Sequence, residues 1–204
     1  MEFVSANPSV IRYITQRALL NAWLRAAHKH QPLPLLAEFD PGDVSGDLPD
    51  MMGYDVEAGG GEPRFIIKQE GARLVATYGN DPRDSRTNRF LHDAIGPERY
   101  ARVLPSYLAC VRHRRPTYSV ATVQDADGKD VSYERLLLPF GFGERVEQII
   151  ASVKAISIEG GFTVDNLMGL QTRRQPVSLI NAVIDRAVAS APAGRRTGDE
   201  VVEI

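Results

Sequence analysis

The stretch Ser132–Gly141, which reads SYERLLLPFG, decides the fold that the sequence predicts. As a β-strand it places Tyr133, Arg135 and Leu137 on one face, because side chains alternate along a strand. The glutamate and the other two leucines share the opposite face. The proline predicts that the ladder of hydrogen bonds ends at Pro139. The alternation leaves open which of the two faces points toward the core.

The segments around this stretch predict further strands. Thr117–Gln124 is rich in residues that favour strands, and the turn DADGK joins it to the opening stretch as a hairpin. Tyr54–Glu57 and Arg64–Gln69 form a second predicted hairpin around three glycines. The apolar residues of 144–158 fit both the helical and the strand period, so periodicity alone does not decide that segment.

Four segments predict helices. Between the two hairpins, 71–78 and 97–114 have apolar residues at helical spacing, and Pro105 predicts a kink or a restart within the longer helix. An amphipathic helix is predicted over 8–30 and another over 177–191. The residues after the last helix are expected to be disordered.

Composition limits the classes of function. The chain has 204 residues, a net charge of −2 and one cysteine, so it has no general attraction to nucleic acid or anionic membranes and no internal disulfide. Its N-terminal residues lack the order of a signal peptide, and the apolar run nearest to them is too short to span a bilayer. We therefore expect a cytoplasmic protein without nucleic-acid binding or membrane insertion.

Three runs carry a resemblance to a known family. They are LLAEFDPGDVSGDLPDMMGYDVE (35–57), PRFIIKQEGARLVATYG (63–79) and YERLLLPFG (133–141). With them the chain resembles PAS sensor domains over about residues 16–158, in particular a branch found mainly in alphaproteobacteria. The resemblance implies that 145–157 is a strand.

The resemblance also implies the architecture. It predicts an α+β fold with a PAS-like, five-stranded antiparallel sheet and short helices on one face, plus N- and C-terminal flanking helices. Residues 35–160 would form the PAS-like domain. Residues 1–34 would form the N-terminal helix and a linker, and 161–204 a C-terminal helix with a disordered tail.

The function implied by the resemblance is that of a sensory or regulatory protein rather than an enzyme. PAS domains hold small ligands between the sheet and its helices, or serve as dimerisation modules, and they pass signals to partner kinases or other regulators. The identity of a ligand or cofactor is left open. The residues expected to line such a pocket are Tyr107, Cys110, Val120, Tyr133, Arg135 and Leu137.

The predicted N-terminal helix carries more apolar surface than a lone flanking helix leaves in water. We expect this surface to form a homodimer, with packing on its own domain as the alternative. The residues of the apolar stripe are Ile11, Ile14, Ala18 and Ala22.

Few residues of this sequence match those that bind the known cofactors of PAS domains. The run TNRFLHD (87–93) lacks the cysteine that light-sensing PAS relatives carry between the positions of Asn88 and Arg89. His92 and His113 are the histidines nearest to a haem pocket, and both fit solvated positions better. No spacing of His, Cys, Asp or Glu predicts a metal site.

Two other classes of function stay open. In a small cone-shaped α+β enzyme, such as an isomerase or hydratase, Tyr133 and Arg135 would form an acid–base site with Glu134, although Glu134 lies on the opposite face. A pure dimerisation module would have a filled core and no ligand. For Arg135 itself, structural work inside the protein or at its surface is favoured over ligand binding.

Overall fold

The computed structural model describes residues 2–27, 32–43, 45–77, 85–125, 127–157, 160–162, 176–185 and 187. Their strands form one seven-stranded sheet in the order β1-β7-β4-β5-β6-β2-β3. The pairs are antiparallel except that β1 runs parallel to β7. The strands are β1 (Val4–Ala6), β2 (Met51–Glu57), β3 (Arg64–Glu70), β4 (Thr117–Gln124), β5 (Asp130–Phe142), β6 (Arg145–Ile156) and β7 (Val177–Ile184).

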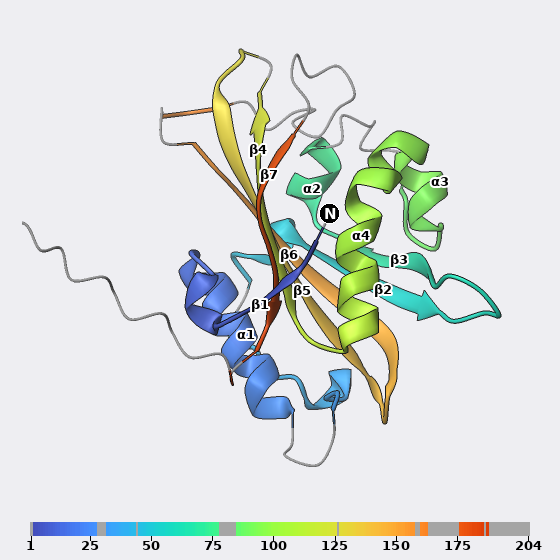
Figure 1. The fold of residues 1–204 in the computed structure, drawn as a ribbon. Helices are drawn as coiled ribbons and strands as arrows, with labels where there is room; N and C mark the ends of the chain where they lie inside the picture. The colour runs from blue at the N-terminus through green and yellow to red at the C-terminus, as the bar shows by residue number, and fades with distance from the viewer. Residues whose placement is uncertain are drawn as a thin grey trace, which may run out of the picture.

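Helices cover both faces of this sheet. Figure 1 shows α1 on one side of the sheet and α2, α3 and α4 on the other. The bounds of the α-helices are α1 (Ile14–Ala26), α2 (Ala72–Thr77), α3 (Leu91–Ile95) and α4 (Pro97–His113). Three short 3-10 helices are η1 (Pro8–Val10), η2 (Leu36–Glu38) and η3 (Leu48–Asp50).

The predicted five-stranded antiparallel sheet with helices on one face is wrong. The sheet has seven strands and is mixed, because β1 and β7 extend it beyond β4 and pair in parallel. The predicted C-terminal flanking helix over 177–191 is wrong as well, since Val177–Ile184 is the strand β7. Three consecutive residues at its end, 182–184, are buried, as in a strand covered on both faces.

Strand β5 is buried on both faces, which answers the question that the alternation left open. Leu136, Leu137 and Leu138 are at most 1% exposed. The strand also runs on through Pro139 to Phe142. On one side, β5 pairs with β4 only as far as Leu137, so Pro139 needs no backbone N–H toward β4. On the other side, β5 pairs with β6 as far as Phe142.

Several predicted elements are confirmed. The two hairpins are present as β2–β3 and β4–β5, and the ambiguous segment is strand β6.

Helix α4 continues through Pro105, so the helix does not restart there. Gly141 is required next to the β5–β6 turn, because an added Cβ there would lie 1.9 Å from the backbone oxygen of Arg145.

Helix α1 packs on the sheet of its own domain. The Trp23 indole N–H donates to the Pro139 carbonyl at 2.6 Å, and the Gln16 amide donates to the Ser152 carbonyl at 3.0 Å. Of the four stripe residues, two lie in this core, Ile11 and Ala22. The other two, Ile14 and Ala18, face solvent. Formation of a homodimer through them stays a prediction.

The predicted helix over 8–30 is shorter in the structure. Pro8–Val10 is a separate 3-10 turn, and α1 begins only at Ile14. Within the described ranges, no helix combines the length and the apolar character that crossing a bilayer requires.

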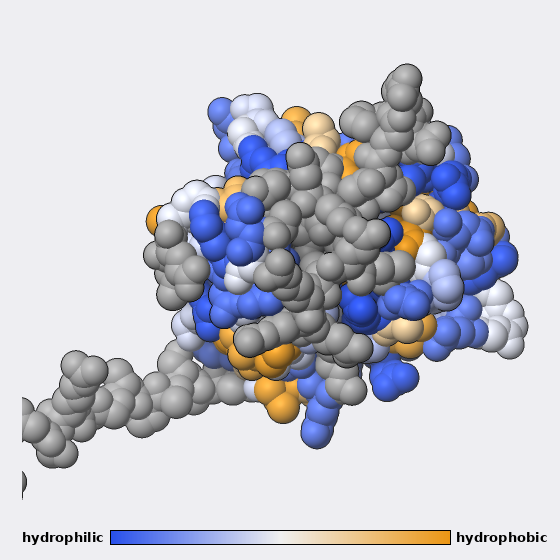
Figure 2. Space-filling model, turned by 90° about the horizontal axis from the view of Figure 1, so that it is seen from above, coloured by the Kyte–Doolittle hydropathy of each residue, from blue (hydrophilic) through white to orange (hydrophobic). Residues whose placement is uncertain are grey.

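Among the coloured residues on the face shown in Figure 2, hydrophilic ones predominate. In Figure 2 the hydrophobic side chains stand in small separate patches among hydrophilic ones. The large apolar residues most exposed in the described segments are Val4, Ile14, Leu48, Phe142, Val177 and Leu179.

Candidate functional site

A cavity of about 150 Å³ lies between helix α4 and the face of the sheet opposite α1. Strands β4, β5 and β7 form its floor. The residues that line it are Arg102, Val103, Ser106, Ser119, Val120, Ala121, Tyr133, Arg135, Pro176, Ser178 and Asn181.

Two cross-strand rows build the floor. Ser119 on β4 pairs with Arg135 on one side and with Asn181 on the other. In the second row Ala121 pairs with Tyr133 on β5 and Ser178 on β7. The middle strand therefore carries two small side chains, and three of their four neighbours are larger, Ser178 being the exception. This difference in side-chain size produces the hollow.

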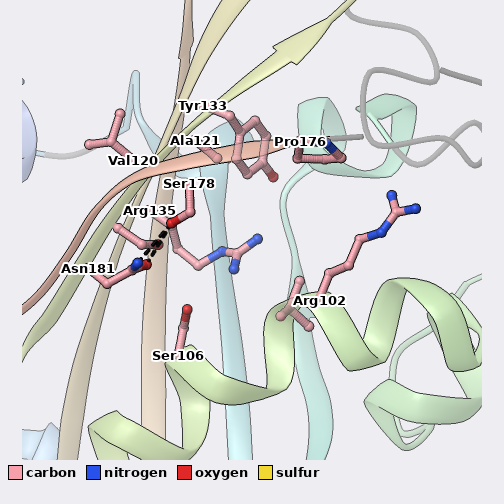
Figure 3. Close-up of a pocket in the computed structure, with 11 residues that line it drawn as sticks. Arg102, Ser106, Val120, Ala121, Tyr133, Arg135, Pro176, Ser178 and Asn181 are labelled. Carbon is pink, nitrogen blue, oxygen red and sulfur yellow. Dashed lines mark hydrogen bonds between the residues drawn. The ribbon is translucent and has the colours of Figure 1, made fainter. Parts of the chain in front are cut away.

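Helix α4 supplies the opposite wall. Arg102 and Ser106 are four residues apart and so share one face of the helix. In Figure 3 the guanidinium of Arg135 points from the sheet toward α4, whereas the side chain of Arg102 extends from α4 away from Arg135. The ring of Tyr133 and Pro176 bound the cavity at the top of the view.

The described lining is electropositive. It contains the two arginines and no acidic residue. Arg135 is 7% exposed, and its guanidinium carbon lies 5.7 Å from the centroid of the Tyr133 ring. Two like charges beside one partly enclosed space raise the local potential and favour an anion there, because water screens them poorly.

Strand β7 contributes neutral polar groups. The Asn181 side-chain amide donates to the Ser178 hydroxyl at 2.8 Å, and that hydroxyl donates to the Asn181 side-chain oxygen at 3.1 Å. Sequence reasoning missed these residues because it interpreted their segment as a helix. The signal that favours a strand is Pro176, followed by a segment with four β-branched residues among its eight.

The six residues predicted to line a pocket fall into two groups. Tyr133, Arg135 and Val120 line this cavity. The side chain of Val120 lies on the α1 face, because it alternates with Ser119 and Ala121. In Figure 3 it points away from the space between the arginines.

The other three predicted residues are core residues. Tyr107 is 3% exposed and packs edge-on against Tyr54, with 5.2 Å between ring centroids. Leu137 and Cys110 are also buried. Burial raises the pKa of the Cys110 thiol, so this cysteine is protonated at neutral pH.

Glu134 lies on the opposite face of the sheet from Arg135. It accepts a hydrogen bond from the Tyr118 hydroxyl at 2.5 Å, and the Arg12 guanidinium lies 3.9 Å from its other oxygen. Burial, followed by the hydrogen bond to Glu134, raises the pKa of Tyr118. The acid–base trio considered for a small enzyme is therefore divided between the two faces.

A second buried cation, Lys154, stands in a different environment. Its ammonium group donates to Asp47 at 2.5 Å and to Asp50 at 2.8 Å, and Arg73 lies 2.5 Å from Asp50. Desolvation acts to lower the pKa of Lys154, but the hydrogen bonds to the two aspartates outweigh it, and the net shift is upward. These charges line a separate cavity of about 340 Å³.

Neither of the two histidines nearest to a predicted haem pocket is buried. His92 stacks on Phe90 and lies 3.1 Å from the Asp93 carboxylate. His113 ends helix α4 and is exposed. In the described parts of the chain, no three His, Cys, Asp or Glu side chains gather as metal ligands would.

Comparisons with known proteins gave no match, either to a family model, to a curated protein or to a solved structure. The resemblance to PAS domains stays a prediction.

Proposed function

We propose that this protein binds a small organic anion in the cavity under α4 and acts as a ligand-responsive regulator. The observation that carries the proposal is that two arginines, Arg102 and Arg135, line one small cavity whose described lining holds no carboxylate. Charge-assisted hydrogen bonds from a guanidinium are among the strongest that a protein offers to an anion.

The lining also fits the organic part of such a ligand. Val103, Ala121 and Pro176 present apolar atoms beside the charged groups. Ligand sites in proteins combine mostly apolar walls with a few polar groups that fix orientation. A carbon skeleton carrying an anionic group would use both kinds of surface.

The position of the cavity supports a regulatory role. Its walls belong to α4, to the centre of the sheet, and to β7 near one edge of the sheet. A ligand held between these elements would favour the arrangement in which α4 and β7 are both close to it. Ligand binding would then shift the population of conformations, and a partner protein would recognise the favoured one.

The direct test is isothermal titration calorimetry and thermal unfolding with a panel of small organic acids. A ligand at 100 times its Kd is expected to stabilise the folded protein by about 2.7 kcal/mol. Arg102→Gln is expected to weaken binding, whereas Arg112→Gln, which removes the same charge from an exposed position of α4, is not.

Two results would contradict the proposal. One is that no acid of the panel binds the unmodified protein, as a dimerisation module without ligand would behave. The other is an equal loss of affinity in Arg112→Gln, because the arginines would then act only through net charge.

A further inference from the structure

We infer that a second copy of this chain docks on the outer side of α4, with the two α4 helices antiparallel. The inference starts from a groove of about 710 Å³ beside α4. Helix α4 lines it with residues that point away from the sheet, and the segment before β1 lines it with Glu2 and Phe3. Figure 1 shows the beginning of the chain next to α4.

Helix α4 has two sides of different character. Val103, Tyr107 and Cys110 are buried on the side that packs on the sheet. The other side carries residues at alternating intervals of three and four, which we call the outer stripe: Glu98, Ala101, Pro105, Leu108 and Arg112. All of them except Glu98 line the groove. This spacing keeps side chains on one face and is the spacing at which two helices pack side by side.

The outer stripe is accessible, and its two charges are available to a partner. Glu98, Ala101 and Arg112 are exposed, and Pro105 and Leu108 are half-buried. Neither Glu98 nor Arg112 forms a side-chain hydrogen bond or ion pair with any residue that the structure describes. A helix that leaves apolar residues between two such charges suits a partner of complementary pattern.

The outer stripe complements itself when a second copy is reversed. Glu98 and Arg112 lie at equal distances along the helix on either side of Pro105. In an antiparallel pair centred on Pro105, Glu98 of each copy therefore faces Arg112 of the other. The next positions inward bring the small Ala101 of each copy against the larger Leu108 of the other. Both contacts occur twice, as a two-fold symmetric interface requires.

The exposed side of α1 does not match itself in this way. The sequence of α1, ITQRALLNAWLRA, contains two arginines and no acidic residue. Ile14, Ala18 and Arg25 share its exposed side, so two α1 helices in contact would bring only positive charges together. Charge complementarity therefore favours α4 over α1 as the contact between copies.

The experiment is sedimentation equilibrium of the full chain over a range of concentrations. We expect a reversible dimer, because one pair of helices makes a small interface. Arg112→Glu and Glu98→Arg are each expected to weaken the dimer by about tenfold or more, since each variant brings like charges together at both ends of the helix pair. Far-ultraviolet circular dichroism would verify that both variants are folded.

An equal mixture of the two variants provides the decisive measurement. In a mixed dimer every contact between positions 98 and 112 joins opposite charges again, so dimerisation is expected to recover to within about threefold of the unmodified protein. The double variant, which carries both substitutions, is expected to recover equally. Arg25→Glu is the control, because it makes the same charge change in the last turn of α1 and is expected to leave the dimer unchanged.

Three results would overturn the inference. A monomer at every concentration would refute the docking of a second copy. A dimer that Arg25→Glu weakens and Arg112→Glu does not would place the contact on α1. A dimer weakened by both α4 variants without recovery in the mixture would refute the antiparallel pairing. None of these results bears on the anion cavity, because neither Glu98 nor Arg112 lines it.

Discussion

Arg135 and Lys154 are two buried cations on neighbouring strands, and the residues described around them differ. Lys154 on β6 is surrounded by two carboxylates of its own chain, Asp47 and Asp50. Arg135 on β5 lies in a cavity whose described lining adds a second arginine and no acid. Carboxylates around a buried ammonium stabilise the fold, whereas two arginines beside one cavity are the feature on which the proposed ligand site rests.

The largest effect is expected from Lys154→Met. The substitution leaves two nearby aspartates with Arg73 as their remaining cation, and we expect it to lower the free energy of unfolding by about 3 kcal/mol. Urea unfolding measures the change. Lys68→Met is the control, because the exposed pair of Lys68 with Asp55 is expected to contribute under about 0.5 kcal/mol. Equal effects would remove the structural role assigned to Lys154.

Tyr118→Phe tests the α1 face of the same sheet. Its hydroxyl donates to the buried carboxylate of Glu134, so its loss is expected to cost about 2 kcal/mol of unfolding free energy. Ligand affinity is expected to stay unchanged, since the cavity lies on the other face. A loss of affinity together with stability would show that the two faces are coupled. Tyr13→Phe, at a partly exposed position, serves as the matched control.

Arg135→Leu tests the role of the buried cation on β5. We expect ligand affinity to fall at least tenfold, about 1.4 kcal/mol, with a smaller loss of stability than in Lys154→Met. The reason is that leucine suits a strand already rich in leucine. Calorimetry and urea unfolding of the same preparation provide both numbers. A variant that cannot fold would instead identify Arg135 as an internal structural element.

The smallest effect concerns alkaline pH. The folded-state pKa of Tyr118 is raised, so the unfolded chain releases the proton first, near its ordinary value of 10.0. The stabilisation is complete below that pH and is lost as the pH rises toward the folded-state pKa. From pH 9 to 10.5 the loss is expected to be about 0.8 kcal/mol. The difference between the unfolding free energies of the unmodified protein and Tyr118→Phe measures it, and parallel curves would exclude the effect.

The sequence predicts the central strands well because their signals are local. The alternation in β4, the DADGK turn and the leucines of β5 each favour one structure, and α4 has a continuous apolar stripe. The period of β6 left helix and strand open, and there the pairing with β5 on one side and β2 on the other decides for a strand.

Strands β1 and β7, at one edge of the sheet, were not predicted because their structure depends on residues distant in the sequence. The segment VSLINAVI satisfies a helical stripe and a strand equally, and its strand form depends on pairing with β4 and β1. Strand β1 has three residues, too few for any periodic signal. For the same reason the sequence placed Arg135 and Tyr133 on one face but did not anticipate the partners that β7 adds, Ser178 and Asn181.

The parallel pairing of β1 with β7 has a consequence for biosynthesis. Val4–Ala6 is synthesised before β2 to β6, and its partner segment, 182–184, only after them. Contacts between such distant segments form late, because closing the long intervening loop is entropically costly. The part of the cavity floor that β7 provides is therefore expected to form after the hairpins and α4. A nascent chain should acquire its affinity for the ligand only when β7 has emerged.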